Sequence, residues 1–326
     1  MADLYCIRGD YGHPWRLKKF VEYQHEVPET HYRFIGEYIK RFVGDKDEAV
    51  RLCWYLSCTY NEITACFLHE KENLLLKNTN KFWKKYKPKL VFNSSRMYAK
   101  SMDWFPELIE QFEIETKERP YKWLKHFCKG DNSREMLYKR LEKLKYTGRF
   151  SIELFVECVI YLQDFFDVEI IEAVEQLDWC ECSNMTSALL NILYLDEEAN
   201  VFDKTGKLDK SLNPLLSDMV REIQKEIQTT YPDQSVDDIV YFMGKLCSFR
   251  NLFKGSRYAG FHHDRELEAI KHYEQHFPKK QYLWDKMYEL RLELFNHKYL
   301  GELNGWNGIR KDRKKLFLSR GLTGAE

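Results

Sequence analysis

Apolar residues recur every three or four positions along most of this chain, which is the period of an α-helix with one buried face. In the segment 46–70 this apolar stripe consists of Leu52, Leu56, Ile63 and Phe67. The segment 149–164 is the most apolar of all, and we expect it at the centre of a core. Further helices are expected at about 15–25, 30–42, 81–86, 103–115, 121–127, 133–145, 168–177, 185–195, 214–230, 264–275 and 282–297. Alternating patterns typical of β-strands are nearly absent, so the sequence predicts an all-α fold built as a helical bundle or array.

The length of the chain sets the expected domain organisation, and a capping signal marks the start of one expected helix. With 326 residues it can bury a sizeable core, and we expect a single large α-helical domain over 1–326, with 1–148 and 149–326 as candidate subdomains. Asn132, followed three residues later by Glu135, has the form of a capping box in front of the helix expected at 133–145.

The formal net charge is zero, but the charges are unevenly distributed along the chain. The stretch 150–203 carries thirteen acidic residues and no lysine or arginine. Cations gather instead at 81–89, in the segment that follows Arg250, and in the tail 310–320. A molecule of this kind can present a basic face to nucleic acid and keep its acidic face in solvent. The alternative is that all of these charges simply lie on solvated faces.

Cysteine usage and hydropathy indicate the compartment. The nine cysteines form no CxxC pair, and the spacings within Cys53/Cys58 and Cys180/Cys182 do not suit a zinc knuckle, so we expect no metal and no cofactor. Charged residues interrupt the early apolar runs, and no run approaches the length of a membrane span. The sequence therefore predicts a cytoplasmic protein with reduced thiols and no membrane contact.

A second face of the segment 46–70 carries candidate acid/base chemistry. Its polar and sulfur-containing residues, at steps of three and four, are Glu48, Arg51, Tyr55, Cys58, Glu62, Cys66 and His69. Glu62 and His69 are two turns apart, so both can project into one cavity, and a carboxylate beside an imidazole is a usable acid/base pair. The alternative is a buried polar cluster that fixes helix packing. The spacing lacks the HExxH pattern of a helical zinc site.

The segment 247–266, between two expected helices, concentrates candidate binding chemistry. Arg250, Lys254 and Arg257 suit a polyanion such as pyrophosphate, because guanidinium groups are planar, forked and permanently charged. The layout is that of a helix–hairpin–helix contact with DNA, in which backbone N–H groups at the start of the second helix bind phosphate. The intervening loop is longer than a tight hairpin, and the alternative is a solvated loop.

Three more residues of this segment are candidates for contact with a base or a reacting group. Tyr258 is suited to stacking on a base or donating a hydrogen bond. His262 and Asp264 are candidate proton acceptors, and Asp264 at a helix start is equally suited to a plain capping role.

Five strings spread over most of the chain carry a family resemblance. They are YQHEVPETH at 23–31, WYLSCTYNEITA at 54–65, KGSRYAG at 254–260, LWDKM at 283–287 and LGE at 300–302. In these strings the chain resembles the alpha-glutamyl/putrescinyl thymine pyrophosphorylases of bacteriophages, also described as amino acid:DNA transferases. The resemblance implies an all-helical, DNA-glycosylase-like fold that acts on hypermodified thymine in the cytoplasm of an infected bacterium.

The resemblance also implies substrates and partners. The family's substrate is double-stranded DNA carrying 5-pyrophosphoryloxymethyluracil, which a partner DNA kinase produces. An amine from an amino acid or a polyamine then displaces pyrophosphate at the exocyclic methylene.

That reaction makes physical demands that the candidate residues fit. The leaving group is a polyanion and calls for cations, for which Arg250, Lys254, Arg257 and Arg16 are candidates. The attacking amine must be neutral and calls for a general base, for which Asp264, His262 and Glu62 are candidates. A base that leaves the stack calls for an aromatic platform, for which Tyr258 and Trp15 are candidates.

Three other classes of protein fit the same residues. One is a DNA-binding accessory protein without chemistry, and another is a glycosylase-like enzyme that excises a base. The third is a helical interaction protein with no nucleic-acid role.

Overall fold

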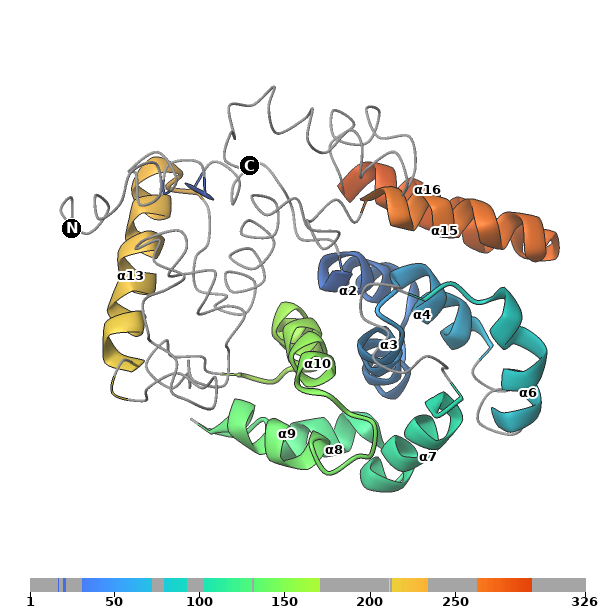
Figure 1. Cartoon of the computed structure of the whole chain (residues 1–326), viewed down its shortest axis with the longest axis horizontal. Coiled ribbons are helices and arrows are strands. Elements are labelled where there is room, and N and C mark those ends of the chain that lie inside the picture. The colour runs from blue at the N-terminus through green and yellow to red at the C-terminus, as the bar shows by residue number, and fades with distance from the viewer. Residues whose placement is uncertain are drawn as a thin grey trace, which may run out of the picture. The chain divides into compact units, whose positions relative to one another are not determined.

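The computed structural model describes Leu17, Phe20, Val21 and residues 31–71, 79–92, 103–130, 132–170, 211, 213–233 and 263–294 (Figure 1). The chain divides into two compact units. The first unit comprises Met1–Glu29, Glu172–Gly260 and Arg310–Glu326, and the second comprises Thr30–Ile171 and Phe261–Ile309. Most of the described residues belong to the second unit. One domain over 1–326, with subdomains meeting at residue 148, stays a prediction.

The described residues are predominantly helical and contain no β-strand, which confirms the all-α class. The helices of the second unit are α2 (His31–Phe42), α3 (Lys46–Thr59), α4 (Glu62–Glu70), α6 (Thr79–Tyr86), α7 (Phe105–Thr116), α8 (Pro120–Phe127), α9 (Ser133–Leu141), α10 (Arg149–Tyr161), α11 (Gln163–Phe166), α15 (His263–His276) and α16 (Gln281–Leu294). Two 3₁₀ turns, η2 (Lys87–Lys89) and η6 (Pro278–Lys280), follow α6 and α15. Among the described residues, no helix combines the length and apolarity needed to cross a membrane.

The helix expected at 46–70 is wrong as one element, because the chain breaks it at Tyr60 and Asn61. Tyr60 adopts a left-handed conformation with φ 52°, and its N–H donates to the Leu56 carbonyl at 2.8 Å. Asn61 is extended, and its side chain accepts a hydrogen bond from the Thr64 N–H at 2.9 Å. A left-handed residue ends α3 and an asparagine cap begins α4, so the two helices fold against each other. Apolar periodicity continues through the break and therefore does not reveal it.

Helix α3 lies at the centre of the second unit, with α2, α4, α8 and α10 packed around it (Figure 1). Every residue of α3 from Ala49 to Thr59 except Arg51 is buried. The Trp54 ring stacks on Phe112 of α7 at 4.6 Å and meets the edge of Phe155 of α10 at 5.7 Å. Aromatic pairs in these geometries add to the free energy gained from area burial. The most apolar segment, now α10, is thus part of the core as expected.

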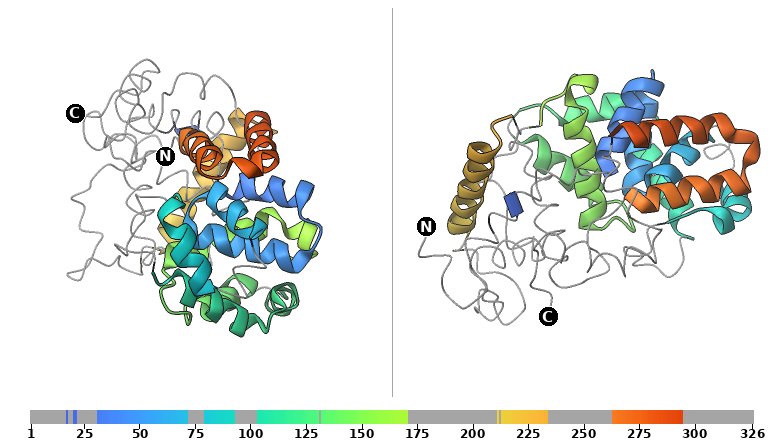
Figure 2. Two further views of the ribbon diagram at one scale, coloured as in Figure 1. Left: turned by 90° about the vertical axis from the view of Figure 1, so that its right-hand side faces the viewer. Right: turned by 90° about the horizontal axis from the view of Figure 1, so that it is seen from above.

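Helices α15 and α16 form an antiparallel hairpin that covers α4 and α2 (Figure 2). The Tyr273 ring of α15 stacks on Trp284 of α16 at 5.3 Å and on Phe67 of α4 at 5.2 Å. The Tyr273 hydroxyl also lies 2.7 Å from the Thr64 hydroxyl. Residues more than 200 positions apart in the chain are therefore fixed together by one buried tyrosine.

Other helix boundaries differ from expectation at their ends. Helix α9 ends at Leu141, and Asn132 makes no side-chain capping hydrogen bond, so the capping box is wrong. Asn132 has φ −105° and ψ 18°, away from the extended conformation that an N-cap residue usually adopts. The expected helix at 149–164 ends at Tyr161, and the short α11 follows.

In the first unit the described helix is α13 (Asn213–Thr230). Its buried apolar residues recur at the helical period and are Leu216, Met219, Val220, Ile223 and Ile227. The helix expected at 214–230 is confirmed.

Candidate functional site

Two of the nine residues predicted for the site lie on described helices. Glu62 is the first residue of α4, and Asp264 lies in the first turn of α15. The other seven lie outside the described residues: Trp15, Arg16, Arg250, Lys254, Arg257, Tyr258 and His262. The sequence-based roles of these seven remain predictions.

The helices that carry Glu62 and Asp264 pack against each other in the second unit. Their contact runs through Thr64 and Tyr273, whose hydroxyl oxygens are 2.7 Å apart. Asp264 precedes Tyr273 by nine residues in α15, which is a rise of about 14 Å along the helix axis. Glu62 is two residues before Thr64, so it lies close in the chain to the residue of α4 that meets Tyr273.

Glu62 is buried in the core, with only 3% of its surface exposed. Burial raises the pKa of the Cys66 thiol well above its ordinary value, and the nearby Glu62 carboxylate raises it further. Burial also raises the pKa of Cys158 on α10, and the neighbouring Cys53, Glu157 and Glu62 raise it further. Glu62 thus lies near the two buried thiols of Cys66 and Cys158, whose raised pKa values keep them protonated and make them poor nucleophiles.

His69, expected to act with Glu62, has Glu48 as its acidic neighbour. The His69 Nε2 atom lies 3.5 Å from a carboxylate oxygen of Glu48, at the far end of the α3–α4 pair. Burial lowers the pKa of His69, and although Glu48 opposes this shift, Arg51 adds to it. A neutral imidazole results near pH 7, so His69 is a proton acceptor held between two helices.

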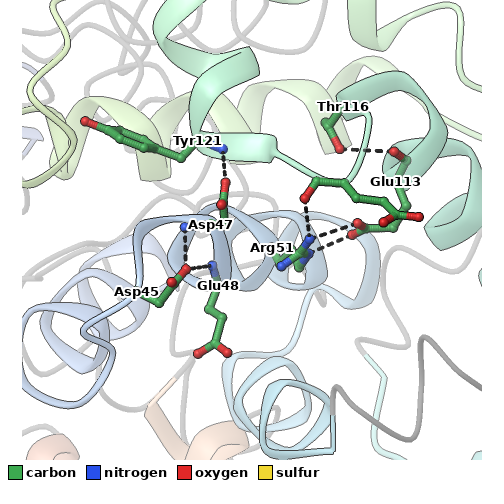
Figure 3. Close-up of polar contacts among 8 residues, drawn as sticks. Asp45, Asp47, Glu48, Arg51, Glu113, Thr116 and Tyr121 are labelled. Atoms are coloured by element: carbon green, nitrogen blue, oxygen red, sulfur yellow. Dashed lines mark hydrogen bonds and ion pairs between the residues drawn. The ribbon is translucent and has the colours of Figure 1, made fainter.

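Arg51 belongs to a clamp between α3 and the end of α7 (Figure 3). Its Nε and Nη2 atoms donate to the two carboxylate oxygens of Glu113 at 2.8 and 3.0 Å, and Nη2 also donates to the Glu118 carbonyl at 3.2 Å. Nearby, the Asp47 carboxylate accepts a hydrogen bond from the Tyr121 N–H at 2.8 Å and holds the start of α8 (Figure 3). These contacts use the polar face of α3 for packing, which is the structural alternative that the sequence left open.

A shallow cavity of about 500 Å³ lies between the end of α8 and α11. Its lining is Lys125, Cys128, Lys129, Gln163, Asp164, Asp167, Val168 and Glu169. The Lys125 ammonium already pairs with Asp167 at 2.7 Å. Burial raises the pKa of the Cys128 thiol to about 12, so this thiol is not a nucleophile near neutral pH. In the described ranges, no group of three or more His, Cys, Asp or Glu residues is placed to hold a metal ion.

The structure adds cations that the sequence did not place with the basic segment 81–89. Lys71, at the end of α4, and Lys279 and Lys280, in η6, lie on elements that contact that segment. In the sequence, Pro278 followed by Lys279 and Lys280 between two expected helices indicates a basic turn. It does not indicate which other elements this turn contacts.

Comparison with known protein families, with characterised proteins and with solved structures finds no match to this chain.

Proposed function

We propose that this protein is a base-modifying transferase that acts on phage DNA. The substrate is double-stranded DNA containing 5-pyrophosphoryloxymethyluracil, and the second substrate is an amino acid or a polyamine. The amine nitrogen attacks the exocyclic methylene carbon, the carbon–oxygen bond to pyrophosphate breaks, and pyrophosphate leaves with the bonding electrons. A general base removes the proton from the attacking nitrogen.

The observation that carries this proposal is the start of α15 at His263. The cation-rich segment 250–258 therefore leads, within a few residues, into the N-terminus of a 14-residue helix. Helix N-termini favour anions, because unpaired N–H groups and the helix dipole both present positive charge there. A segment rich in Arg and Lys that runs into such an N-terminus suits the pyrophosphate leaving group and the DNA backbone. The proposed helix–hairpin–helix contact and glycosylase-like architecture use α15 as the second helix.

The burial of Glu62 bears on the choice of base. A carboxylate that is 3% exposed and lies near the buried Cys66 thiol is poorly placed to meet an amine from solvent. We therefore assign the general base to the start of α15, to Asp264 or to the neighbouring His262. Tyr258 and Trp15 remain the proposed platforms for an extruded base.

Mass spectrometry of nucleosides tests the proposal directly. The protein is incubated with duplex DNA carrying the pyrophosphorylated base and with a pool of amino acids and polyamines. The expected product is a nucleoside with an amine-substituted methyl group, together with free pyrophosphate. Unchanged nucleosides would overturn the proposal, and free base with abasic sites would replace it with a glycosylase.

A substitution at Arg257 tests whether the segment 250–258 takes part in the reaction. Arg257→Ala is expected to lower the rate of pyrophosphate release by about 100-fold, the size expected when one electrostatic stabiliser of a transition state is lost. Lys122→Ala, an exposed lysine on α8, is the matched control and is expected to retain the full rate. Full turnover by Arg257→Ala would remove the segment 250–258 from the mechanism.

A further inference from the structure

The second unit gathers lysines from three separate segments on one surface. The first segment is α6 with η2, which carries Lys81, Lys84, Lys85, Lys87 and Lys89 and no acidic residue. The second is Lys71 at the end of α4, and the third is η6, with Lys279 and Lys280. We call this set of residues the lysine surface.

An aromatic cluster holds the three segments together. The Tyr86 ring, at the end of α6, lies 5.9 Å from Phe67 of α4 and 5.8 Å from Phe277, the residue before η6. The Lys89 ammonium lies 5.6 Å from the Phe277 ring centre, and the Lys89 carbonyl is 2.9 Å from the His272 ring. Figure 1 shows α6 beside the end of the α15–α16 hairpin. The positions of the three segments are thus set by aromatic packing around the buried Phe67 ring.

The charges on this surface repel one another. Burial lowers the pKa of Lys71, and close approach to Lys280 and then Lys85 lowers it further. Glu70 offsets part of this charge, because it pairs with Lys280 at 2.6 Å. Asp103 likewise pairs with Lys87. Lys81, Lys84, Lys85, Lys89 and Lys279 are exposed. Holding so many like charges in one place is unfavourable in the free protein, and a bound polyanion relieves it.

We infer that the lysine surface binds the phosphate backbone of duplex DNA. This inference rests on the proposed function, and it assigns a DNA contact to α6, η2, η6 and the end of α4 in addition to the one proposed for the segment 250–258. Lysine ammonium groups act as point charges without the forked geometry that reads base edges, so they suit contacts that do not depend on sequence. Such contacts are what an enzyme needs to hold a duplex while it acts on one base.

The test compares two triple variants with the same change in net charge. The first is Lys84→Ala/Lys85→Ala/Lys279→Ala, which removes three exposed lysines of the surface and leaves the Lys280–Glu70 and Lys87–Asp103 pairs intact. The control is Lys122→Ala/Lys129→Ala/Lys143→Ala, which removes three exposed lysines carried by other segments of the same unit. Fluorescence anisotropy measures the affinity of the full chain for an unmodified duplex between about 50 and 200 mM salt.

Each lost phosphate contact is expected to reduce the slope of log affinity against log salt by about 0.9. The affinity ratio of the wild-type chain to the first variant therefore narrows about 40-fold over this salt range, while the control keeps the wild-type slope. Equal slopes for the two variants would overturn the inference. Stronger binding to an RNA duplex of the same length, lost in the first variant, would overturn the assignment to DNA.

The outcome is distinguishable from that of the proposed function. DNA binding that depends on these lysines, without amine transfer, would support the lysine surface as a DNA contact and contradict the proposed transferase activity. Amine transfer together with unchanged DNA affinity in the first variant would support the transferase activity and contradict the DNA contact of the lysine surface.

Discussion

The Arg51 guanidinium donates two hydrogen bonds to the Glu113 carboxylate, with heavy-atom distances of 2.8 and 3.0 Å. The two residues are 62 positions apart, and only 12% of each side chain is exposed. With so little solvent around them, each of the two charges is stabilised mainly by the other. Removing one partner leaves an uncompensated charge, which raises the free energy of the folded state. The pair ties the central helix α3 to the end of α7, so its loss should affect the whole second unit.

Arg51→Ala is expected to lower the free energy of unfolding by about 2 to 4 kcal/mol, since it leaves the Glu113 carboxylate without its main partner. Urea denaturation of Arg51→Ala, Glu113→Ala and the double variant measures the coupling between them. The double variant should be less destabilised than the sum of the single variants. Lys139→Ala, which removes an exposed pair with Glu135, should leave the midpoint nearly unchanged. Additive effects at positions 51 and 113 would contradict the clamp.

Gly36→Ala tests the contact between α2 and α10. A Cβ atom at Gly36 would lie 2.2 Å from Cδ1 of Tyr161, and this ring is fixed because its hydroxyl donates to Glu37 at 2.8 Å. Overpacking outweighs the better helix propensity of alanine, and we expect a net loss of about 1 to 2 kcal/mol. Gly44→Ala is the matched control, because a Cβ atom at Gly44 would meet no described atom within 4 Å. A Gly36→Ala variant as stable as Gly44→Ala would show that the ring yields freely.

His69 makes stability depend on pH. Burial lowers its pKa below the ordinary value of 6.5, so the unfolded chain binds a proton more readily than the folded one. Between the folded pKa and 6.5, stability therefore rises with pH, and it is lost as the pH falls from 6.5 through the folded pKa. The loss is about 1.4 kcal/mol for each unit by which the two pKa values differ.

Urea denaturation between about pH 5 and pH 8 measures the free energy of unfolding of the wild-type chain and of His69→Gln. The glutamine does not titrate, so the comparison isolates the contribution of His69. The groups that face His69 are Glu48, Glu70 and Arg51, and they remain in both proteins. The difference in stability between the wild-type chain and the variant should shift in favour of the variant as the pH falls below 6.5. A difference that stays constant across this range would show that His69 titrates normally.

The sequence predicts the helices of this fold well because their apolar periods are strong and local. Helices α2, α7, α8, α13, α15 and α16 begin and end within a few residues of the expected positions. The break between α3 and α4 was missed because Tyr60 takes a left-handed conformation that its residue type does not signal. Long-range contacts such as Thr64–Tyr273 were missed because no local pattern encodes which helices meet.

The candidate site was predictable only as residue types. An acid and an imidazole at helical spacing suggested a Glu62–His69 pair, whereas folding of α4 against α3 places Glu48 beside His69. The basic segment 81–89 was visible as a run of lysines. Its junction with Lys71 and Lys280 depends on the packing of Phe67, Tyr86 and Phe277, which only the fold determines.

The choice of general base gives a last prediction, which rests on the proposed transferase. Asp264→Asn or His262→Gln is expected to lower kcat by about 100-fold, the contribution typical of a positioned base. Glu62→Gln should keep kcat within a few fold, because this carboxylate is buried in the core near the thiols of Cys66 and Cys158. Rates of pyrophosphate release at saturating amine measure all three variants, and urea midpoints show which variants remain folded. A Glu62→Gln variant with a wild-type midpoint and a kcat lowered by about 100-fold would move the base into the core, and the amine would then have to reach Glu62 through an opening between α4 and its neighbours.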